Sequence, residues 1–72
     1  MREAFYIHLG KNIKKRRKEL HLTQQELADR LGLSLNFIGK IEVAFSKPSL
    51  DTLIDIAEKL ETTVSELANF SK

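Results

Sequence analysis

The sequence predicts an all-α fold of five helices, and three observations support this. Ser or Thr residues stand before most of the candidate helices as caps, apolar residues recur every three or four positions, and one Pro and three Gly interrupt the chain only briefly. Seventy-two residues suffice for one domain with a modest core. The helices of this single domain, which spans 1–72, are expected at about 2–20, 24–31, 35–44, 50–60 and 64–70.

The first helix is predicted by one apolar face in a stretch without Pro. Its residues are Phe5, Leu9, Ile13 and Leu20. Gly10 interrupts this stretch and is expected to weaken the helix by about 1 kcal/mol relative to Ala.

The second helix has clear start and stop signals. Thr23 and Glu26 form a capping box, and Leu22 and Leu27 have the spacing of a hydrophobic staple. The helix is expected to end at Gly32, which adopts the left-handed conformation without strain.

The third helix begins after Ser34, which is placed to cap it, and it is amphipathic. Its inward arc carries Phe37, Ile38 and Ile41. The outward arc mixes methyl groups, an amide, an ammonium group and bare backbone: Leu35, Asn36, Gly39, Lys40 and Val43. Two short helices, a turn containing Gly and such a face match the helix-turn-helix unit that binds DNA.

The last two helices are also marked by caps. Pro48 ends the preceding loop and Ser49 caps a helix that is apolar over a wide arc, Leu50, Leu53, Ile54, Ile56, Ala57 and Leu60. Thr63 and Glu66 form a second capping box, before an apolar face of Val64, Leu67 and Phe70. These apolar faces exceed what a single small domain needs, which favours a homodimer through the last two helices.

The charge is small overall but unevenly placed. Residues 1–48 carry ten Lys and Arg against five Asp and Glu, whereas residues 49–72 carry two against five. A cluster of Lys and Arg between residues 11 and 18 adds to the basic end. This polarity suits a molecule that turns one end toward a polyanion such as double-stranded DNA.

Several function classes find no support in the sequence. There is no Cys, and His8 and His21 have no metal-binding spacing, so neither a metal nor another cofactor is expected. No apolar run is long enough to span a membrane, and the N-terminus does not have the pattern of a signal peptide, so we expect a soluble, cytoplasmic protein. The sequence shows no combination of a nucleophile, a base and an orienting acid, so an enzyme is not expected.

From Ile13 to Phe70 the chain resembles the lambda-repressor-like family of bacterial and phage regulators, also called the Cro or XRE type. The residues that carry the resemblance are Arg17, Leu22 to Gln24, Leu27 and Ala28, Gly32, Ile38 to Glu42, Pro48 and Ser49, Leu53, Ile56 and Ala57. The resemblance implies a five-helix DNA-binding domain that commonly dimerises. It further implies a partly buried ion pair between Arg17 and Glu42 that joins the first and third helices.

Roles in DNA binding follow from the resemblance together with side-chain chemistry. Asn36 can bind adenine through two hydrogen bonds, Lys40 can donate to guanine, Leu35 can touch a thymine methyl group, and Gly39 lets the backbone approach the bases. Gln24 lies at a helix N-terminus, where phosphate binding is favoured. The complete set of expected phosphate contacts is Gln24, Ser34, Lys14, Arg16, Ser46 and Lys47.

The chain departs from the family at two helix exits. His21 stands where relatives often have Gly. After Glu42, Val43-Ala44-Phe45 replaces a polar residue, a Gly and a basic residue. Either Ala44 adopts the left-handed conformation at a cost of about 1 kcal/mol, or the third helix continues to residue 44, and we favour the second arrangement.

The sequence therefore predicts a transcriptional regulator that binds double-stranded DNA. We expect a repressor that occupies a near-palindromic operator as a dimer, with its recognition helices about 34 Å apart. The alternative is a protein-interaction module on the same fold, such as an antitoxin that binds a toxin. Its candidate contact residues are Val43, Phe45, Phe5, Tyr6 and Ile7.

Overall fold

The computed structural model describes residues 2–69, and this part of the chain is entirely helical apart from turns and loops. The prediction of an all-α, five-helix domain is confirmed. The helices are α1 (Arg2–Glu19), α2 (Gln24–Leu31), α3 (Leu35–Glu42), α4 (Leu50–Lys59) and α5 (Val64–Leu67).

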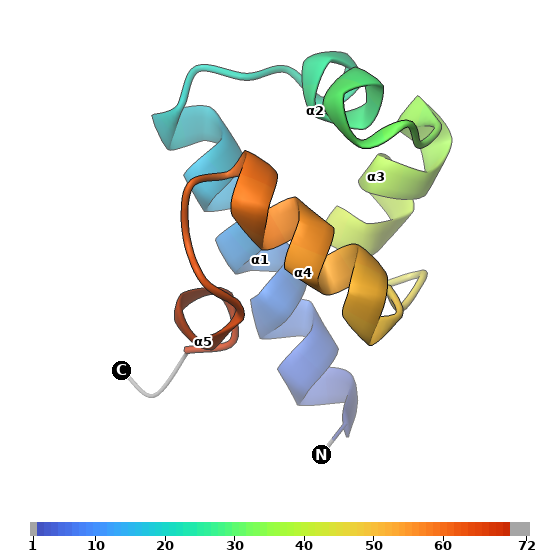
Figure 1. Ribbon diagram of the computed structural model, residues 1–72. Coiled ribbons are helices and arrows are strands. Elements are labelled where there is room, and N and C mark those ends of the chain that lie inside the picture. Colours follow the sequence, from blue (N-terminus) through green and yellow to red (C-terminus); the bar gives the residue numbers. More distant parts are fainter. Residues whose placement is uncertain (1, 70–72) are drawn as a thin grey trace.

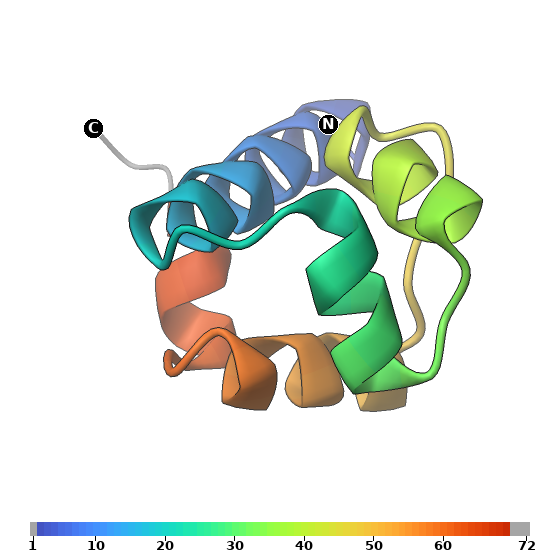
Figure 2. The same cartoon turned by 90° about the horizontal axis from the view of Figure 1, so that it is seen from above.

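The helices enclose one core in a body of about 31 × 21 × 20 Å. Figure 1 shows α4 crossing in front of α1, with α2 and α3 together at the upper right. Seen from above in Figure 2, α1 and α4 form two opposite sides, while α3 and α5 lie at opposite ends. α5 is therefore remote from α3, whereas α4 follows α3 through the loop of residues 43–49.

The core takes residues from every helix because each contributes one apolar face. The largest fully buried side chains are Leu9, Ile13, Leu27, Ile38, Ile56 and Leu60. Leu33, in the turn between α2 and α3, packs against this core and fixes how the two helices meet.

Helices α2 to α5 begin at the capping residues that their sequences predict, although only the Thr63 half of the second predicted capping box, Thr63 and Glu66, is formed. At each start a Ser or Thr hydroxyl accepts a hydrogen bond from the backbone N–H three residues later, and these caps are Thr23, Ser34, Ser49 and Thr63. At α2 the Glu26 carboxylate also accepts from the Thr23 N–H at 2.8 Å, which completes the capping box.

Helices α1 to α4 all end in the same way, at a residue in the left-handed region. These residues are His21, Gly32, Ala44 and Glu61, with φ between 57° and 68°. The following residue donates its N–H to the carbonyl five positions back, as in the Schellman motif. Only one of the four is Gly, so three exits carry strain of about 1 kcal/mol each.

The exit of α3 corrects the expected boundary. α3 ends at Glu42 and does not continue to residue 44, because Ala44 turns the chain with φ of 65°. The Phe45 N–H then donates to the Lys40 carbonyl at 2.8 Å. These bonds satisfy carbonyls that a helix end leaves open, which offsets the strain at Ala44.

The other differences in helix bounds are smaller. α1 and α4 each end one residue before the expected end, and α5 ends at Leu67. The last helix is therefore shorter than the expected 64–70, because Ala68 and Asn69 lie in a turn and a loop, and Phe70 itself is outside the described residues.

Gly10 proves to be a packing residue of α1. A Cβ atom at this position would lie 2.6 Å from the carbonyl oxygens of both Ile41 and Glu42. The missing side chain thus lets α1 approach the last turn of α3, so the expected loss of helix stability has a compensating gain in packing.

Candidate nucleic-acid interface

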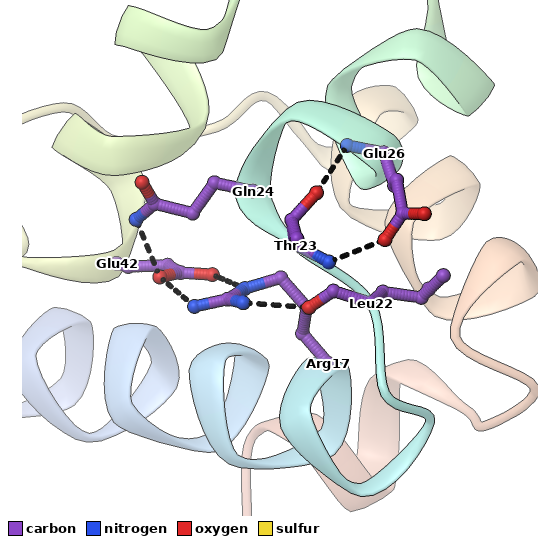
Figure 3. A network of polar contacts seen from close by, with 6 residues as sticks. All are labelled: Arg17, Leu22, Thr23, Gln24, Glu26 and Glu42. Carbon is purple, nitrogen blue, oxygen red and sulfur yellow. Dashed lines mark hydrogen bonds and ion pairs between the residues drawn. The ribbon is translucent and has the colours of Figure 1, made fainter.

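A buried polar network fixes the last turn of α3 (Figure 3). The Arg17 guanidinium donates from Nε to Glu42 Oε2 at 2.6 Å and from Nη2 to Oε1 at 3.0 Å, while Nη1 donates to the Leu22 carbonyl at 2.7 Å. Both charged side chains are buried. The fork of Arg matches a carboxylate in two places at once, so this pair holds α3 at a defined position relative to α1.

Gln24 extends the same network to the N-terminus of α2. Its amide Nε2 donates to Glu42 Oε1 at 2.9 Å, so one N–H of the amide is already used within the protein. Within the described residues this is the one hydrogen bond that the Gln24 amide donates, and the backbone N–H of a first helical residue has no intrahelical partner. Both groups are suited to an anion at this edge of α3.

The outward face of α3 carries the four side chains or positions expected to read bases. Asn36 is exposed and the Leu35 side chain is 44% exposed, whereas Gly39 and Lys40 are half-buried. The inward residues Ile38, Ile41 and Glu42 are buried. The helix therefore separates an anchored face from an open one, as a recognition helix must.

Gly39 leaves space on that open face. A methyl group there would lie 3.8 Å from Gln24 Nε2, which is ordinary van der Waals contact. Internal packing of the domain therefore does not require Gly at this position, unlike at Gly10. The bare backbone has a function only if another molecule approaches α3 closely.

The remaining candidates for phosphate contact differ in their surroundings. Ser34 is exposed and its hydroxyl accepts from the Phe37 N–H at 3.0 Å, which leaves the hydroxyl proton for an acceptor outside the protein. Lys14 is exposed on α1, three residues from Arg17. On the loop after α3, the Lys47 ammonium lies 5.4 Å from the centre of the Tyr6 ring, and Ser46 is half-buried.

Arg16 does not have the surroundings expected of a phosphate contact. Its Nε donates to the Leu60 carbonyl at 2.8 Å and its Nη2 to the Glu61 carbonyl at 3.2 Å, while Nη1 forms an ion pair with Glu19. These bonds satisfy carbonyls at the end of α4. The side chain therefore faces the α4–α5 turn, away from the outward face of α3, and we assign it a structural role.

Sequence reasoning missed the contacts of Gly10 and Phe45. Gly10 precedes Arg17 by seven residues, so two helical turns place both on the face that meets α3, and this spacing was the available signal. Phe45 lies beside Lys40, whose ammonium is 5.5 Å from the ring centre. The available signal for the Phe45 contact was the left-handed conformation considered for Ala44, because that conformation places the next side chain beside the last turn of the helix.

Electrostatics at the start of α2 agree with the cap geometry. The hydrogen bonds from the backbone and then the side chain of Thr23 lower the pKa of Glu26 below its ordinary value of 4.5.

Within residues 2–69, no cluster of three or more His, Asp or Glu is placed to hold a metal ion. None of the helices described is long and apolar enough to cross a membrane.

Comparison with known proteins gives consistent matches over most of the chain. A model of the helix-turn-helix family, HTH_3, matches residues 13–67. The chain is 37% identical over 51 residues to the cryptic phage CTXphi transcriptional repressor RstR of Vibrio cholerae, covering 71% of this chain and 46% of that protein. It is 36% identical over 59 residues to control protein C.SmaI of Serratia marcescens, covering 82% of this chain and 70% of that protein.

A solved structure extends the similarity to three dimensions. SinR, the master regulator for biofilm formation, solved in complex with DNA, has a TM-score of 0.79 and 29% identity over 85% of this chain and 98% of that one. The chain spans about half the length, or somewhat less, of the first curated relatives that it matches.

Proposed function

Because the chain belongs to the Cro/C1-type helix-turn-helix family of DNA-binding regulators, we propose that it is a sequence-specific transcriptional repressor. It binds double-stranded DNA in the major groove and acts in the cytoplasm. The observation that carries this proposal is the two-faced α3, whose inner face is fixed by the Arg17–Glu42 pair while its outer face stays open. Rigid support of a reading face is what base discrimination requires.

Base reading is assigned to the outer face of α3. Asn36 offers the paired donor and acceptor that adenine N7 and N6 need, and Lys40 offers a donor for guanine. Leu35 supplies an apolar contact for a thymine methyl group, and Gly39 permits the close approach that its unfilled space allows.

Phosphate contacts flank this face on both sides. The free N–H groups of Gln24 and the hydroxyl of Ser34 lie at the starts of α2 and α3, where the helix dipoles favour anions. Lys14, Ser46 and Lys47 supply the other contacts, and Arg16 is left out because its donors are bound at the end of α4.

A homodimer through α4 and α5 completes the proposal. Leu50 and Ile54 lie one turn apart on α4, with exposed fractions of 67% and 42%, beside the buried part of the same helix. A two-fold pair that covers these side chains would present two copies of α3 to successive turns of a near-palindromic operator. Analytical ultracentrifugation of Leu50→Asp should then show a shift toward monomer, and an unchanged mass would reject this surface.

The proposed function is tested by selecting bound sequences from a pool of random duplexes. We expect one enriched, near-palindromic site whose affinity falls steeply with salt, because bound phosphates release counterions. No enrichment, together with no duplex binding at low salt, would reject the proposal.

Asn36 provides the sharpest single-residue test of base reading. Asn36→Ala should weaken binding to the selected duplex by about 1 to 3 kcal/mol and leave binding to random duplex nearly unchanged. Equal losses on both duplexes would reassign Asn36 to the DNA backbone.

The alternative, a protein-interaction module of the antitoxin kind, has one specific observation in its favour. Val43 and Phe45 are exposed by 73% and 75%, an unusual fraction for large apolar side chains. Phe5 and Tyr6 are less suited to a partner because they pack against the core. Absence of duplex binding combined with tight protein binding that changes little with salt would favour this alternative.

A further inference from the structure

Phe45 is the most exposed of the large apolar side chains in the described chain, at 75%. It follows the left-handed Ala44, and the residues in the same place at the other three exits differ from it. Leu22 is buried, Leu33 packs against the core, and Thr62 is half-buried. Packing of this domain therefore accounts for the side chains at the other exits and does not account for an aromatic ring at position 45.

The backbone at this exit determines what the ring contacts. The N–H groups of Phe45 and Ser46 donate to the Lys40 carbonyl at 2.8 and 3.1 Å. In this motif the side chain after the left-handed residue comes to lie beside the third residue from the helix end. That residue is Lys40, and its ammonium lies 5.5 Å from the centre of the Phe45 ring.

This contact restrains a flexible side chain on the open face of α3. An ammonium group within about 6 Å of an aromatic face is attracted by the negative potential of the ring. A Lys side chain loses much rotamer freedom on binding, so a partly ordered one loses less. Resting on the proposed function, we propose that Phe45 is a positioning residue that orients the Lys40 ammonium for contact with DNA.

The proposal predicts coupling between two residues, which a double-mutant cycle measures. Phe45→Ala should weaken binding to the selected duplex by about 2- to 5-fold, the range of an exposed cation–π contact. In a chain that already carries Lys40→Ala, the same change should have no further effect. Among single base-pair variants of the duplex, Phe45→Ala and Lys40→Ala should lose discrimination at the same position.

Two variants of Phe45 separate the aromatic face from simple bulk. Phe45→Tyr keeps the ring and should bind like the wild type, whereas Phe45→Leu keeps an apolar side chain and should bind like Phe45→Ala. Ala4→Ser, at an exposed position of α1 that has no assigned role in binding, is the surface control. It should leave affinity and base preference unchanged.

Salt dependence and folding provide further readouts. Phe45→Ala removes no charge, so the slope of binding against salt should equal that of the wild type. The unfolding midpoint should also stay within the range of an ordinary surface substitution. A merely structural role would move the midpoint and would not move a single base preference.

The outcomes distinguish this inference from the function on which it rests. If the wild type selects a duplex but Phe45→Ala weakens binding equally with and without Lys40, or Phe45→Leu binds like the wild type, the positioning role is overturned alone. If the wild type selects no duplex, the proposed function fails first. A loss of affinity on Phe45→Ala that occurs only in chains that carry Lys40 would support both the positioning role and the proposed function.

Discussion

The two faces of the last turn of α3 are held in different ways. On the inner face, Glu42 is buried and bound to Arg17 and Gln24 through three hydrogen bonds. On the outer face, Lys40 is half-buried and restrained mainly by the ring of Phe45. The two faces therefore have different roles. The inner face fixes the position of α3, and side chains on the outer face can be exchanged to alter which bases α3 reads without moving the helix.

The largest expected effect on stability comes from removing the buried ion pair on the inner face of α3. Glu42→Ala would leave the Arg17 guanidinium buried without its carboxylate, so the free energy of unfolding should fall by about 3 to 5 kcal/mol. Urea unfolding followed by circular dichroism measures this loss. Glu58→Ala, at an exposed position of α4, is the control and should change stability by less than about 0.5 kcal/mol. An equally small loss for both variants would show that the pair contributes little.

A second test compares two glycines that meet the two faces. Gly10→Ala places a Cβ atom 2.6 Å from two carbonyl oxygens, so α1 and α3 must separate, and the expected cost is about 1 to 3 kcal/mol. Gly39→Ala meets no clash and should stabilise α3 by up to about 1 kcal/mol. The same variant should bind the selected duplex more weakly. Thermal unfolding and duplex titration of both variants measure these effects. Stabilisation by Gly10→Ala together with destabilisation and tighter binding by Gly39→Ala would contradict the different roles of the two faces.

A third test addresses the turn that joins the two faces. Ala44→Gly removes the strain of the left-handed conformation, and the more flexible unfolded chain offsets part of the gain, so a net stabilisation of about 0.5 to 1 kcal/mol is expected. Ala4→Gly, at an exposed position inside α1, should instead destabilise by about 1 kcal/mol. Equal losses for both variants in thermal unfolding would mean that position 44 does not need the left-handed region.

The smallest effect concerns the start of α2, which holds Gln24 next to the inner face. Because Thr23 lowers the pKa of Glu26 in the folded state, ionised Glu26 stabilises the fold above pH 4.5. This contribution should disappear as the pH falls through the lowered pKa. Unfolding free energies of the wild type and Glu26→Gln, measured from pH 7 down to pH 3, should therefore converge. A difference that is independent of pH would exclude the carboxylate as its source.

Local signals explain how much of the fold and site could be predicted. The caps at Thr23, Ser34, Ser49 and Thr63 depend on a hydroxyl and the next helical turn, so sequence alone reveals them. The open face of α3 follows from helical periodicity. The contacts of Arg16 could not be predicted in this way, because its partners, the carbonyls of Leu60 and Glu61, lie more than forty residues away in the chain.

The sequence by itself determined five helices, their starts and the residues that α3 turns outward, because these depend on neighbours within one helical turn. Only the tertiary structure decided how Gly10 brings α1 to the end of α3, which donors remain free on Gln24, and where the ring of Phe45 rests. Ala44 shows the reason most directly. Local propensity favoured a longer helix, but the chain must turn there so that α4 can close the core.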